Sequence, residues 1–522
     1  MFPCHPGIAW LAIRRGHLRV GRWCGCVQGV GRPVGAVPEA APTALRAWLP
    51  NGDTPAGWMA GCADAVTNAS MISGGGRIFY APICPGHPIT ITLRPAPETE
   101  RPEGTLTVVT RHPVPGYPNI HHHMKHAYII DAVRTPIGKY GGALSTIRPD
   151  DLLAHVIKAL LQRNPSIDIN SIEDVIAGDA NQAGEDNRNV ALMAALLAGL
   201  PVTVPGNTVN RLCASGLQSI MDAARAIMCN EGELYIAGGV ESMTRAPFVL
   251  AKSSGAWNRH PEMFDSTIGW RFPNKKLTDK YYPYSMGETA ENVAKQWNIS
   301  RHAQDEFALQ SQEKYFAAFK QGKFKDEIAA VEILGGKEEK IYLEADEPPR
   351  HTSMEKLAAL RPAFIKDGTV TAGNSSGIND GAAALLLASE EAVEKYNLKP
   401  MARIVSMAVA GVDPAIMGIG PVPATRKALQ RAGLTVNDLD LVELNEAFAS
   451  QSIACIHELG LDLQKINVNG GSIAIGHPLG CSGSRISATL LHEMKRRQSR
   501  YGLATMCVGV GQGAAIIYEG II

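Results

Sequence analysis

From residue 126 onward the chain alternates between strand-like and helix-like segments, and this alternation most constrains its fold. A β-rich run at 126–133 is followed by a helical pattern at 150–161 and a second strand-like run at 171–178. The alternation pauses over 244–376 and then resumes to the end of the chain. Such alternation is typical of α/β proteins, in which helices cover a sheet. The two alternating blocks predict a duplicated α/β core.

One helix is expected to be buried on every side. The segment 214–228, ASGLQSIMDAARAIM, is apolar or small on nearly every face, which predicts a place in the middle of a domain. The segment 244–376 differs, because it is more charged, holds scattered prolines and has a long helical pattern after Ser300. Ser300 is a residue type that caps helices. We interpret this segment as an insertion over the core that covers a ligand.

Composition changes sharply near residue 124. Every lysine lies after this point, and 1–124 holds four of the seven tryptophans without a sustained helical or strand period. Its arginines and scarce acidic residues suggest a targeting or regulatory arm, but it is much too long for a transit peptide. We interpret 1–124 as an irregular extension, disordered or non-native, ahead of a true start at Met124. Cys24, Cys26 and the histidines at 121–123 fit no standard metal-site spacing.

Length and charge exclude several classes of protein. A chain of 522 residues usually holds more than one packed unit. A net charge of zero gives no reason to expect nucleic acid or an anionic membrane as a partner. No apolar run approaches the ~20 residues of a membrane-spanning helix. The ten cysteines follow no metal or disulfide pattern, which predicts reduced thiols in a cytoplasmic protein.

Cys213 lies in NTVNRLCASGLQS, between a strand and the buried helix. The N-terminal end of a helix carries partial positive charge, so it is expected to lower the pKa of a thiol and create a nucleophile. A buried cysteine can also be simply a small hydrophobic residue. The neighbours Asn210, Arg211 and Ser215 favour the nucleophile.

His477 and Cys507 lie in glycine-rich segments. His477, in GGSIAIGHPLG, is expected on a turn after a short apolar strand, where it can act as a base or merely close the turn. Cys507 ends an apolar strand and precedes glycines whose N–H groups can face a developing negative charge. A dinucleotide loop is excluded because a strand follows. Cys481 is expected to pack inside a helix.

Asn445 and Glu446 close the strand LDLVEL and open a helix. Ligands of open α/β sheets bind at strand ends, so this pair is a candidate for the site. The alternative for Glu446 is a helix-terminal charge.

Six segments occur in an order and spacing that resemble the thiolases, the acetyl-CoA acyltransferases: NRLCASG, GGVESMTRAPF, RPAFIKDGTVTAGNSSGINDGAA, NEAFA, GHPLGCSGSR and CVGVGQG. The resemblance covers about residues 125–522 and nothing in 1–124. It implies a duplicated layered α-β-α-β-α core with halves at 125–243 and 394–522. It also implies an inserted loop domain at 244–376 that covers the coenzyme A (CoA) site, and 377–393 as the last strand and helix of the first half.

The resemblance implies three catalytic residues. Cys213 matches the cysteine that attacks the 3-oxo group and becomes acylated. His477 matches the histidine that activates this cysteine. Cys507 matches the second cysteine, which moves a proton to and from the acetyl-CoA carbon.

The resemblance also implies binding residues. Asn445 matches the asparagine that holds an oxyanion-hole water beside the histidine. The N–H groups of Gly509 and Cys213 match a second oxyanion hole. Ser376 and Met286 match contacts to the pantetheine arm of CoA.

The acyl group is a finer question. Ser285 stands where short-chain acetoacetyl-CoA thiolases carry histidine. QAGEDNRNVALMA, STIGWRF and CVGVGQG resemble the thiolases of aromatic-acid breakdown, which cleave 3-oxoadipyl-CoA to succinyl-CoA and acetyl-CoA. We expect that substrate; the alternatives are a broad 3-ketoacyl-CoA thiolase of fatty-acid β-oxidation and an acetoacetyl-CoA thiolase. Arg271 and Lys275 are candidates to face a terminal carboxylate, or else solvated surface charges.

Two rival classes are weighed against this prediction. A condensing ketosynthase would pair its cysteine with two histidines, or with histidine and asparagine, and would lack Cys507. A non-catalytic CoA or lipid carrier would have lost Cys213 or His477. We therefore expect an enzyme with CoA and acyl-CoA as partners, neither nucleic acid nor membrane, and a homodimer or homotetramer. No metal or cofactor is expected beyond CoA as a substrate.

Overall fold

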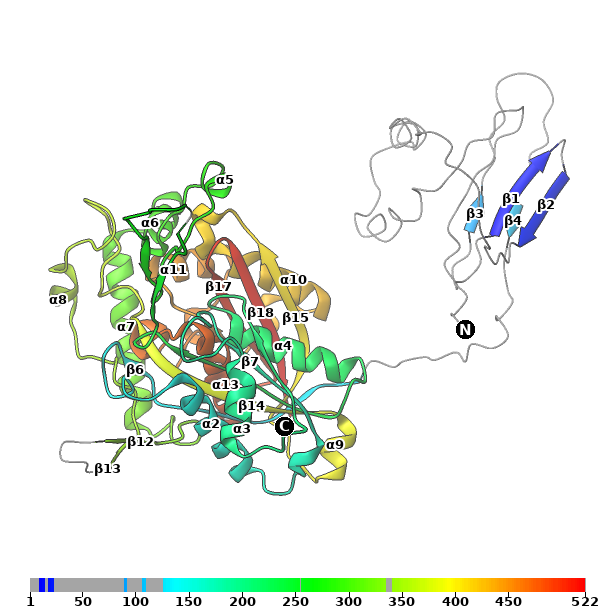
Figure 1. The fold of residues 1–522 in the computed structure, drawn as a ribbon, viewed down its shortest axis with the longest axis horizontal. Helices are drawn as coiled ribbons and strands as arrows, with labels where there is room; N and C mark the ends of the chain where they lie inside the picture. Colours follow the sequence, from blue (N-terminus) through cyan, green and yellow to red (C-terminus); the bar gives the residue numbers. More distant parts are fainter. Residues whose placement is uncertain are drawn as a thin grey trace, which may run out of the picture. The chain divides into compact units, whose positions relative to one another are not determined.

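The computed structural model describes residues 9–14, 17–22, 89–91, 106–108, 125–253, 255–334 and 340–521 (Figure 1). The chain divides into two compact units, Met1–Ile120 and His121–Ile522. In the first unit, β1 (Ala9–Arg14) pairs with β2 (His17–Arg22), and β3 (Ile89–Ile91) pairs with β4 (Leu106–Val108). The other predictions made for 1–124 lie outside the described residues.

The second unit is built on one ten-stranded mixed sheet. Its order is β16 (Leu441–Leu444), β17 (Tyr501–Val508), β18 (Gln512–Gly520), β15 (Ala402–Gly411), β5 (Tyr128–Arg134), β14 (Asn379–Ala388), β9 (Leu234–Ser242), β7 (Ile172–Gly178) and β8 (Gly206–Val209), with β6 (Gly138–Lys139) on β14. Strand β7 is parallel to β8 and β9, and β16 is parallel to β17, whereas the other pairs are antiparallel. Only two residue pairs join β5 to β15, so the sheet has two halves that meet at a short seam.

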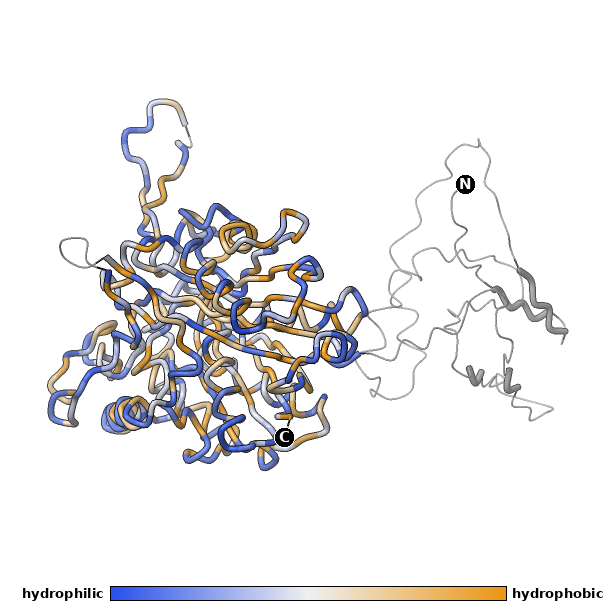
Figure 2. The backbone as a smooth tube through the Cα atoms, turned by 90° about the horizontal axis from the view of Figure 1, so that it is seen from below, coloured by the Kyte–Doolittle hydropathy of each residue, from blue (hydrophilic) through white to orange (hydrophobic). Residues whose placement is uncertain are grey.

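Two helices form the centre of this unit. One apolar cluster joins α4 (Ser215–Met228) and α13 (Leu479–Arg497) to strands of both halves of the sheet. A second cluster packs α2 (Pro149–Arg163) and α3 (Val190–Ala198) on the first half, and a third packs α10 (Pro421–Ala432) and α11 (Ala449–Leu459) on the second. Figure 2 shows hydrophobic segments crossing the centre of this unit and hydrophilic ones along its outer turns. The predicted duplicated α-β-α-β-α layering is confirmed.

Between β9 and β14 the chain forms smaller elements: β10 (Phe248–Leu250), β11 (Met263–Asp265), α5 (Lys275–Thr278), α6 (Met286–Gln296), α7 (Arg301–Lys320), β12 (Val331–Leu334), β13 (Lys340–Leu343) and α8 (Met354–Ala358). Ser300 caps α7 as predicted, because its hydroxyl accepts a hydrogen bond from the Ala303 N–H at 3.1 Å. Ser285 caps α6 in a reciprocal pair with Glu288, which gives this serine a structural role. The limits predicted for the two halves and for the inserted loop domain stay a prediction.

The remaining elements are α9 (Glu390–Lys395), α12 (Ser472–Ile475) and four 3₁₀ turns: η2 (Ile169–Ser171), η4 (Pro414–Ile419), η5 (Val436–Asp438) and η6 (Leu463–Lys465). The apolar strand predicted before His477 is wrong, because these residues form the helical turn α12. Within the described segments, no helix combines the length and apolar character that crossing a bilayer requires.

Candidate active site

Cys213 occupies a tight turn directly before α4. Leu212 has a φ of 48°, a left-handed conformation that residues other than glycine rarely adopt. Side chains hold this turn: Asn210 Oδ1 accepts from the Leu212 N–H at 2.8 Å, and Ser215 Oγ donates to the Leu212 carbonyl at 2.6 Å. The Arg211 N–H donates to Ser215 Oγ at 2.9 Å. The surrounding bonds therefore fix the backbone at the cysteine despite its strain.

The thiol of Cys213 is protonated at neutral pH. Burial raises its pKa to about 11, and the N–H groups of Gly509 and of Cys213 itself act in the opposite direction to a smaller extent. The lowered pKa expected from the helix end is therefore wrong. Cys213 precedes the N-cap residue Ala214 and lies outside the helix, and the cost of desolvating a thiolate outweighs the nearby N–H groups. A nucleophilic role for this sulfur requires a neighbouring base.

Cys507 lies in β17, where it is buried and pairs across the hairpin with Gly513 of β18. Its pKa is raised well above the usual range by burial first and by the charge of Cys213 second. The hairpin turn also reaches the turn before α4, because a Cβ built on Gly509 would lie 3.4 Å from Leu212 Cδ1. A second link is the Arg211 guanidinium, whose Nη1 donates to Gln512 Oε1 at 2.9 Å.

His477 is buried between α12 and α13 and held at both backbone and ring. Its N–H donates to Asn379 Oδ1 at 2.9 Å, and its Nδ1 lies 2.6 Å from Ser482 Oγ. Since Ser482 Oγ donates its only proton to the Pro478 carbonyl, we assign the ring proton to Nδ1 and a lone pair to Nε2. Burial, and secondly the charge of Arg485, lower the pKa of His477 to about 3. The imidazole is therefore neutral at pH 7.

Asn445 follows β16 and faces His477. Its Nδ2 lies 3.4 Å from His477 Nε2, and its Oδ1 accepts from Ser472 Oγ at 2.6 Å. Glu446 is fully buried and is not a solvated helix-terminal charge. Its carboxylate accepts hydrogen bonds from Ser311 Oγ, Asn467 Nδ2 and the Ile473 N–H. Glu446 therefore ties α7 to the loop that carries His477.

The starts of α4 and α13 are in contact. A Cβ on Gly216 would lie 2.6 Å from the Gly480 carbonyl oxygen, so only glycine allows this approach. Gly216 is three residues past Cys213 and Gly480 is three residues past His477. Each of these two predicted residues therefore lies within three residues of a contact between the central helices.

The other predicted residues lie in different surroundings. Met286 Sδ would lie 3.5 Å from a Cβ on Gly509, and Met286 packs on the cluster that contains Cys507. Ser376 is partly exposed, and its hydroxyl donates to the Ala447 carbonyl at 3.1 Å. Lys275 lies apart, with its side chain 87% exposed and paired with Asp279. Cys481 is buried inside α13 as predicted.

Arg271 is partly buried and held against the first half of the unit. Its guanidinium donates to Asn181 Oδ1 at 2.8 Å and to the Asn181 carbonyl at 3.2 Å, which are both neutral oxygens. The adjacent Ala180 carbonyl accepts from Asn210 Nδ2 at 2.9 Å. Because Asn210 braces the turn that carries Cys213, Arg271 connects to that turn through a short hydrogen-bonded path.

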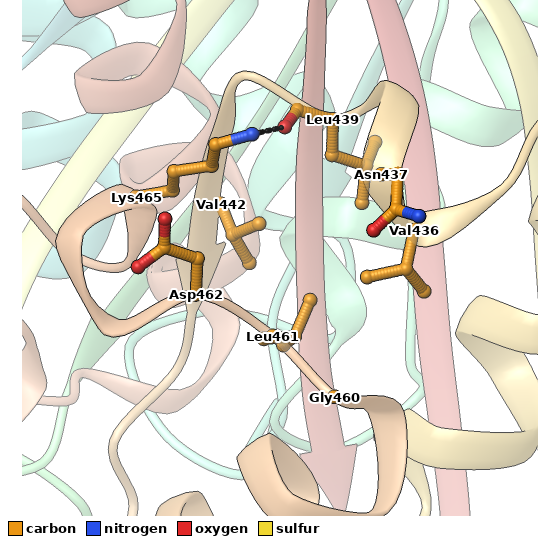
Figure 3. A pocket seen from close by; sticks show the side chains of 8 residues that line it. All are labelled: Val436, Asn437, Leu439, Val442, Gly460, Leu461, Asp462 and Lys465. Carbon is orange, nitrogen blue, oxygen red and sulfur yellow. Dashed lines mark hydrogen bonds between the residues drawn. The ribbon is translucent and has the colours of Figure 1, made fainter.

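A separate small pocket lies at the η5 and η6 turns (Figure 3). It is lined by residues such as Val436, Leu461 and Asp462, and Lys465 Nζ donates to the Leu439 carbonyl at 2.7 Å beside it. None of the residues predicted for catalysis lines this pocket. In the part of the chain that the structure describes, no three metal-ligating side chains gather in one place.

Sequence reasoning missed four polar residues that hold the site: Asn379, Ser472, Ser482 and Arg485. All four lie inside or beside segments quoted for the resemblance. The available signal was a set of polar side chains in otherwise apolar or glycine-rich stretches. Their partners were not predictable, because Asn379 meets His477 across 98 residues of sequence.

Comparisons with known proteins identify the family of the chain. The thiolase N-terminal domain model matches residues 127–391, and the thiolase C-terminal domain model matches 398–520. The 3-oxoadipyl-CoA/3-oxo-5,6-dehydrosuberyl-CoA thiolase of Escherichia coli K12 is 55% identical over 399 residues, which are 76% of this chain and 100% of that protein. A beta-ketoadipyl-CoA thiolase of Pseudomonas aeruginosa is 56% identical over 398 residues, 76% of this chain and 99% of that protein.

The fold is also found among solved structures. The human mitochondrial 3-ketoacyl-CoA thiolase has a TM-score of 0.72 and 44% sequence identity, over 76% of this chain and 100% of that chain. Both family models fall on the α/β part of the chain. The chain is therefore a member of the thiolase family of acyltransferases.

Proposed function

We propose that this thiolase cleaves 3-oxoadipyl-CoA with CoA to give succinyl-CoA and acetyl-CoA. The observation that supports the chemistry is the contact between the starts of α4 and α13, which follow a protonated Cys213 and a neutral His477, together with the influence of the Cys213 charge on a protonated Cys507. The substrate is supported by the names of the relatives that are 55% and 56% identical over nearly their whole length.

In the first step Cys213 adds to the ketone. Its thiol proton passes to the lone pair of His477 Nε2, and the sulfur bonds to C3 of the substrate. The C3 oxygen takes the electron pair of the carbonyl and becomes an oxyanion. The N–H groups of Cys213 and Gly509, which already act on the sulfur, are suited to stabilise that charge.

In the second step the carbon–carbon bond breaks. The oxyanion collapses to an acyl group on Cys213, and the electron pair of the C2–C3 bond moves into the acetyl-CoA enolate. The enolate oxygen accepts one hydrogen bond from the protonated Nε2 of His477 and one from the oxyanion-hole water that Asn445 holds. Cys507 gives its proton to C2, and acetyl-CoA leaves. The raised pKa of Cys507 suits this role, because the residue must hold a proton until the carbanion forms.

In the third step CoA takes the acyl group. The CoA thiol gives its proton to the Cys507 thiolate, and its sulfur attacks the acyl carbon. His477 returns its proton to the departing sulfur of Cys213. CoA is thus a substrate, and these steps use no resident metal or cofactor. Ser376 and Met286 are proposed to contact the pantetheine arm, while a dimer or tetramer in the cytoplasm stays a prediction.

Arg271 is the proposed partner of the terminal carboxylate of 3-oxoadipyl-CoA. Among the residues that the structure describes, its guanidinium bonds only to neutral oxygens, so its charge is available to a carboxylate, and it connects to the turn that carries Cys213. A charge-assisted hydrogen bond contributes about 1.5–3 kcal/mol, which corresponds to roughly 10- to 100-fold in affinity. Arg271→Gln is therefore expected to lower kcat/KM for 3-oxoadipyl-CoA by about that factor.

The test compares 3-oxoadipyl-CoA with acetoacetyl-CoA, which has no terminal carboxylate, by following the loss of the substrate enolate absorbance. Arg271→Gln should leave acetoacetyl-CoA cleavage near the wild-type value, and Lys275→Gln is the control because that lysine is exposed and paired with Asp279. A wild-type kcat/KM that is higher for acetoacetyl-CoA would contradict the proposed substrate and favour the short-chain alternative.

A further inference from the structure

Arg485 is a buried cation whose hydrogen bonding is incomplete. It lies on α13, its side chain is 0% exposed, and its Nε and Nη1 have no hydrogen-bond partner in the described part of the chain. Nη1 lies 3.8 Å from Glu443 Oε2, which is a loose ion pair. Leaving buried donors unpaired costs about 1–3 kcal/mol each. Stability alone therefore gives no reason for an arginine at this position.

Among the residues that the structure describes, this guanidinium makes one hydrogen bond, and that bond leads directly to the site. Arg485 Nη2 donates to Ser472 Oγ at 2.5 Å. A hydroxyl has a single proton, and Ser472 directs it to Asn445 Oδ1 at 2.6 Å. The amide oxygen of Asn445 is thus held toward Ser472, and its Nδ2 is held 3.4 Å from His477 Nε2.

We propose that Arg485 and Ser472 are positioning residues that fix the Asn445 amide with its N–H toward the oxyanion-hole water, which in turn donates to the oxygen of the departing acetyl-CoA enolate. This inference rests on the proposed function. If the amide flipped, the carbonyl oxygen of Asn445 would compete with the enolate oxygen for the protons of that water. Arg485 opposes the flip because it occupies one of the two lone pairs of Ser472 Oγ while the serine proton bonds to Asn445 Oδ1, and a flipped amide would take that acceptor away.

Electrostatics supports the same assignment. The charge of Arg485 contributes to the lowered pKa of His477, so it is felt at the ring that borders the enolate. The carboxyl of Glu443 offsets the positive charge of Arg485 only in part. Burial raises the pKa of this carboxyl to about 8, although the charge of Arg485 acts to lower it. The positive charge of Arg485 favours the negative charge that develops beside His477 when the carbon–carbon bond breaks.

The test separates carbon–carbon cleavage from acyl transfer. Exchange of isotopically labelled CoA into succinyl-CoA or acetyl-CoA proceeds through acyl-Cys213 and forms no enolate. Ser472→Ala is expected to lower kcat for thiolysis by about 10- to 100-fold and to leave exchange near wild type. Arg485→Met should act in the same way, and Arg485→Lys, which keeps a charged donor, should recover part of the loss. If Arg485→Met does not fold, Ser472→Ala decides.

The matched control is Ser487→Ala. It removes a fully buried hydroxyl from α13 that accepts a hydrogen bond from the Tyr518 hydroxyl. It should change neither reaction. Equal losses of thiolysis and exchange in Ser472→Ala, or no loss at all, overturn the inference. Assays use whichever of 3-oxoadipyl-CoA and acetoacetyl-CoA the wild-type protein cleaves, so an error in the substrate leaves the test intact. If the wild-type protein cleaves neither, the proposed function fails and this inference fails with it.

Discussion

The two central helices hold the same place in the two halves of the sheet, and each is preceded by a proposed catalytic residue. Cys213 lies before α4 and is partly accessible, in a turn with a strained Leu212. His477 lies before α13 and is buried, with its backbone N–H and its Nδ1 both hydrogen-bonded. The fold thus repeats one scaffold and uses it twice. In the proposed mechanism one helix start presents a nucleophile to a substrate, and the other holds a base in a single tautomer.

The largest effect should come from the α4 side. Cys213→Ser is expected to lower kcat/KM for thiolysis by about three orders of magnitude or more, because a neutral imidazole deprotonates a serine hydroxyl poorly. The control is Cys229→Ser at the other end of α4, where the side chain is exposed. Enolate absorbance measures both variants. Activity of Cys213→Ser near the wild-type level would remove the nucleophile from this helix start.

A smaller effect concerns the pH dependence of Cys213. Because burial raises the pKa of this thiol to about 11, its thiolate fraction should rise about tenfold per pH unit between pH 6 and 9. The rate of alkylation by iodoacetamide, followed on the Cys213 peptide by mass spectrometry in a Cys229→Ser background, should rise in proportion. The pKa of His477 is about 3, so no inflection is expected near pH 6.5.

A plateau of the alkylation rate near neutral pH would contradict this expectation. It would mean that Cys213 and His477 rest as a thiolate–imidazolium pair, so that both helix starts are charged before substrate binds. His477→Gln distinguishes the two cases. It should leave the pH profile unchanged if the thiol is protonated at rest, and it should remove the plateau if the pair exists.

The layers of the fold and the candidate residues before the two helices could be predicted from the sequence. The contacts that hold those residues in place could not. Strand and helix periods depend on local residue spacing, so α4 could be predicted as a buried helix from its small and apolar faces. The pKa of Cys213 could not be predicted in the same way, because it depends on burial by segments distant in sequence. The same holds for the bonds from Asn379 to His477 and from Arg485 to Ser472, which form only after the halves pack.

The smallest predicted effect tests the contact between the two helix starts. In Gly216→Ala the new Cβ would lie 2.6 Å from the Gly480 oxygen and 2.7 Å from Ser484 Oγ, so one helix must shift. Overpacking costs about 1–3 kcal/mol, which exceeds the gain of up to about 1 kcal/mol from alanine in a helix. Thermal unfolding should show a lower Tm than wild type, whereas the control Gly255→Ala, whose Cβ would meet nothing within 4 Å, should not. Since Cys213 and His477 each lie three residues before this contact, the shift should also lower kcat. A variant with a lower Tm and an unchanged kcat would show that the two helix starts hold their residues independently, and that the duplicated scaffold does not need this contact to align them.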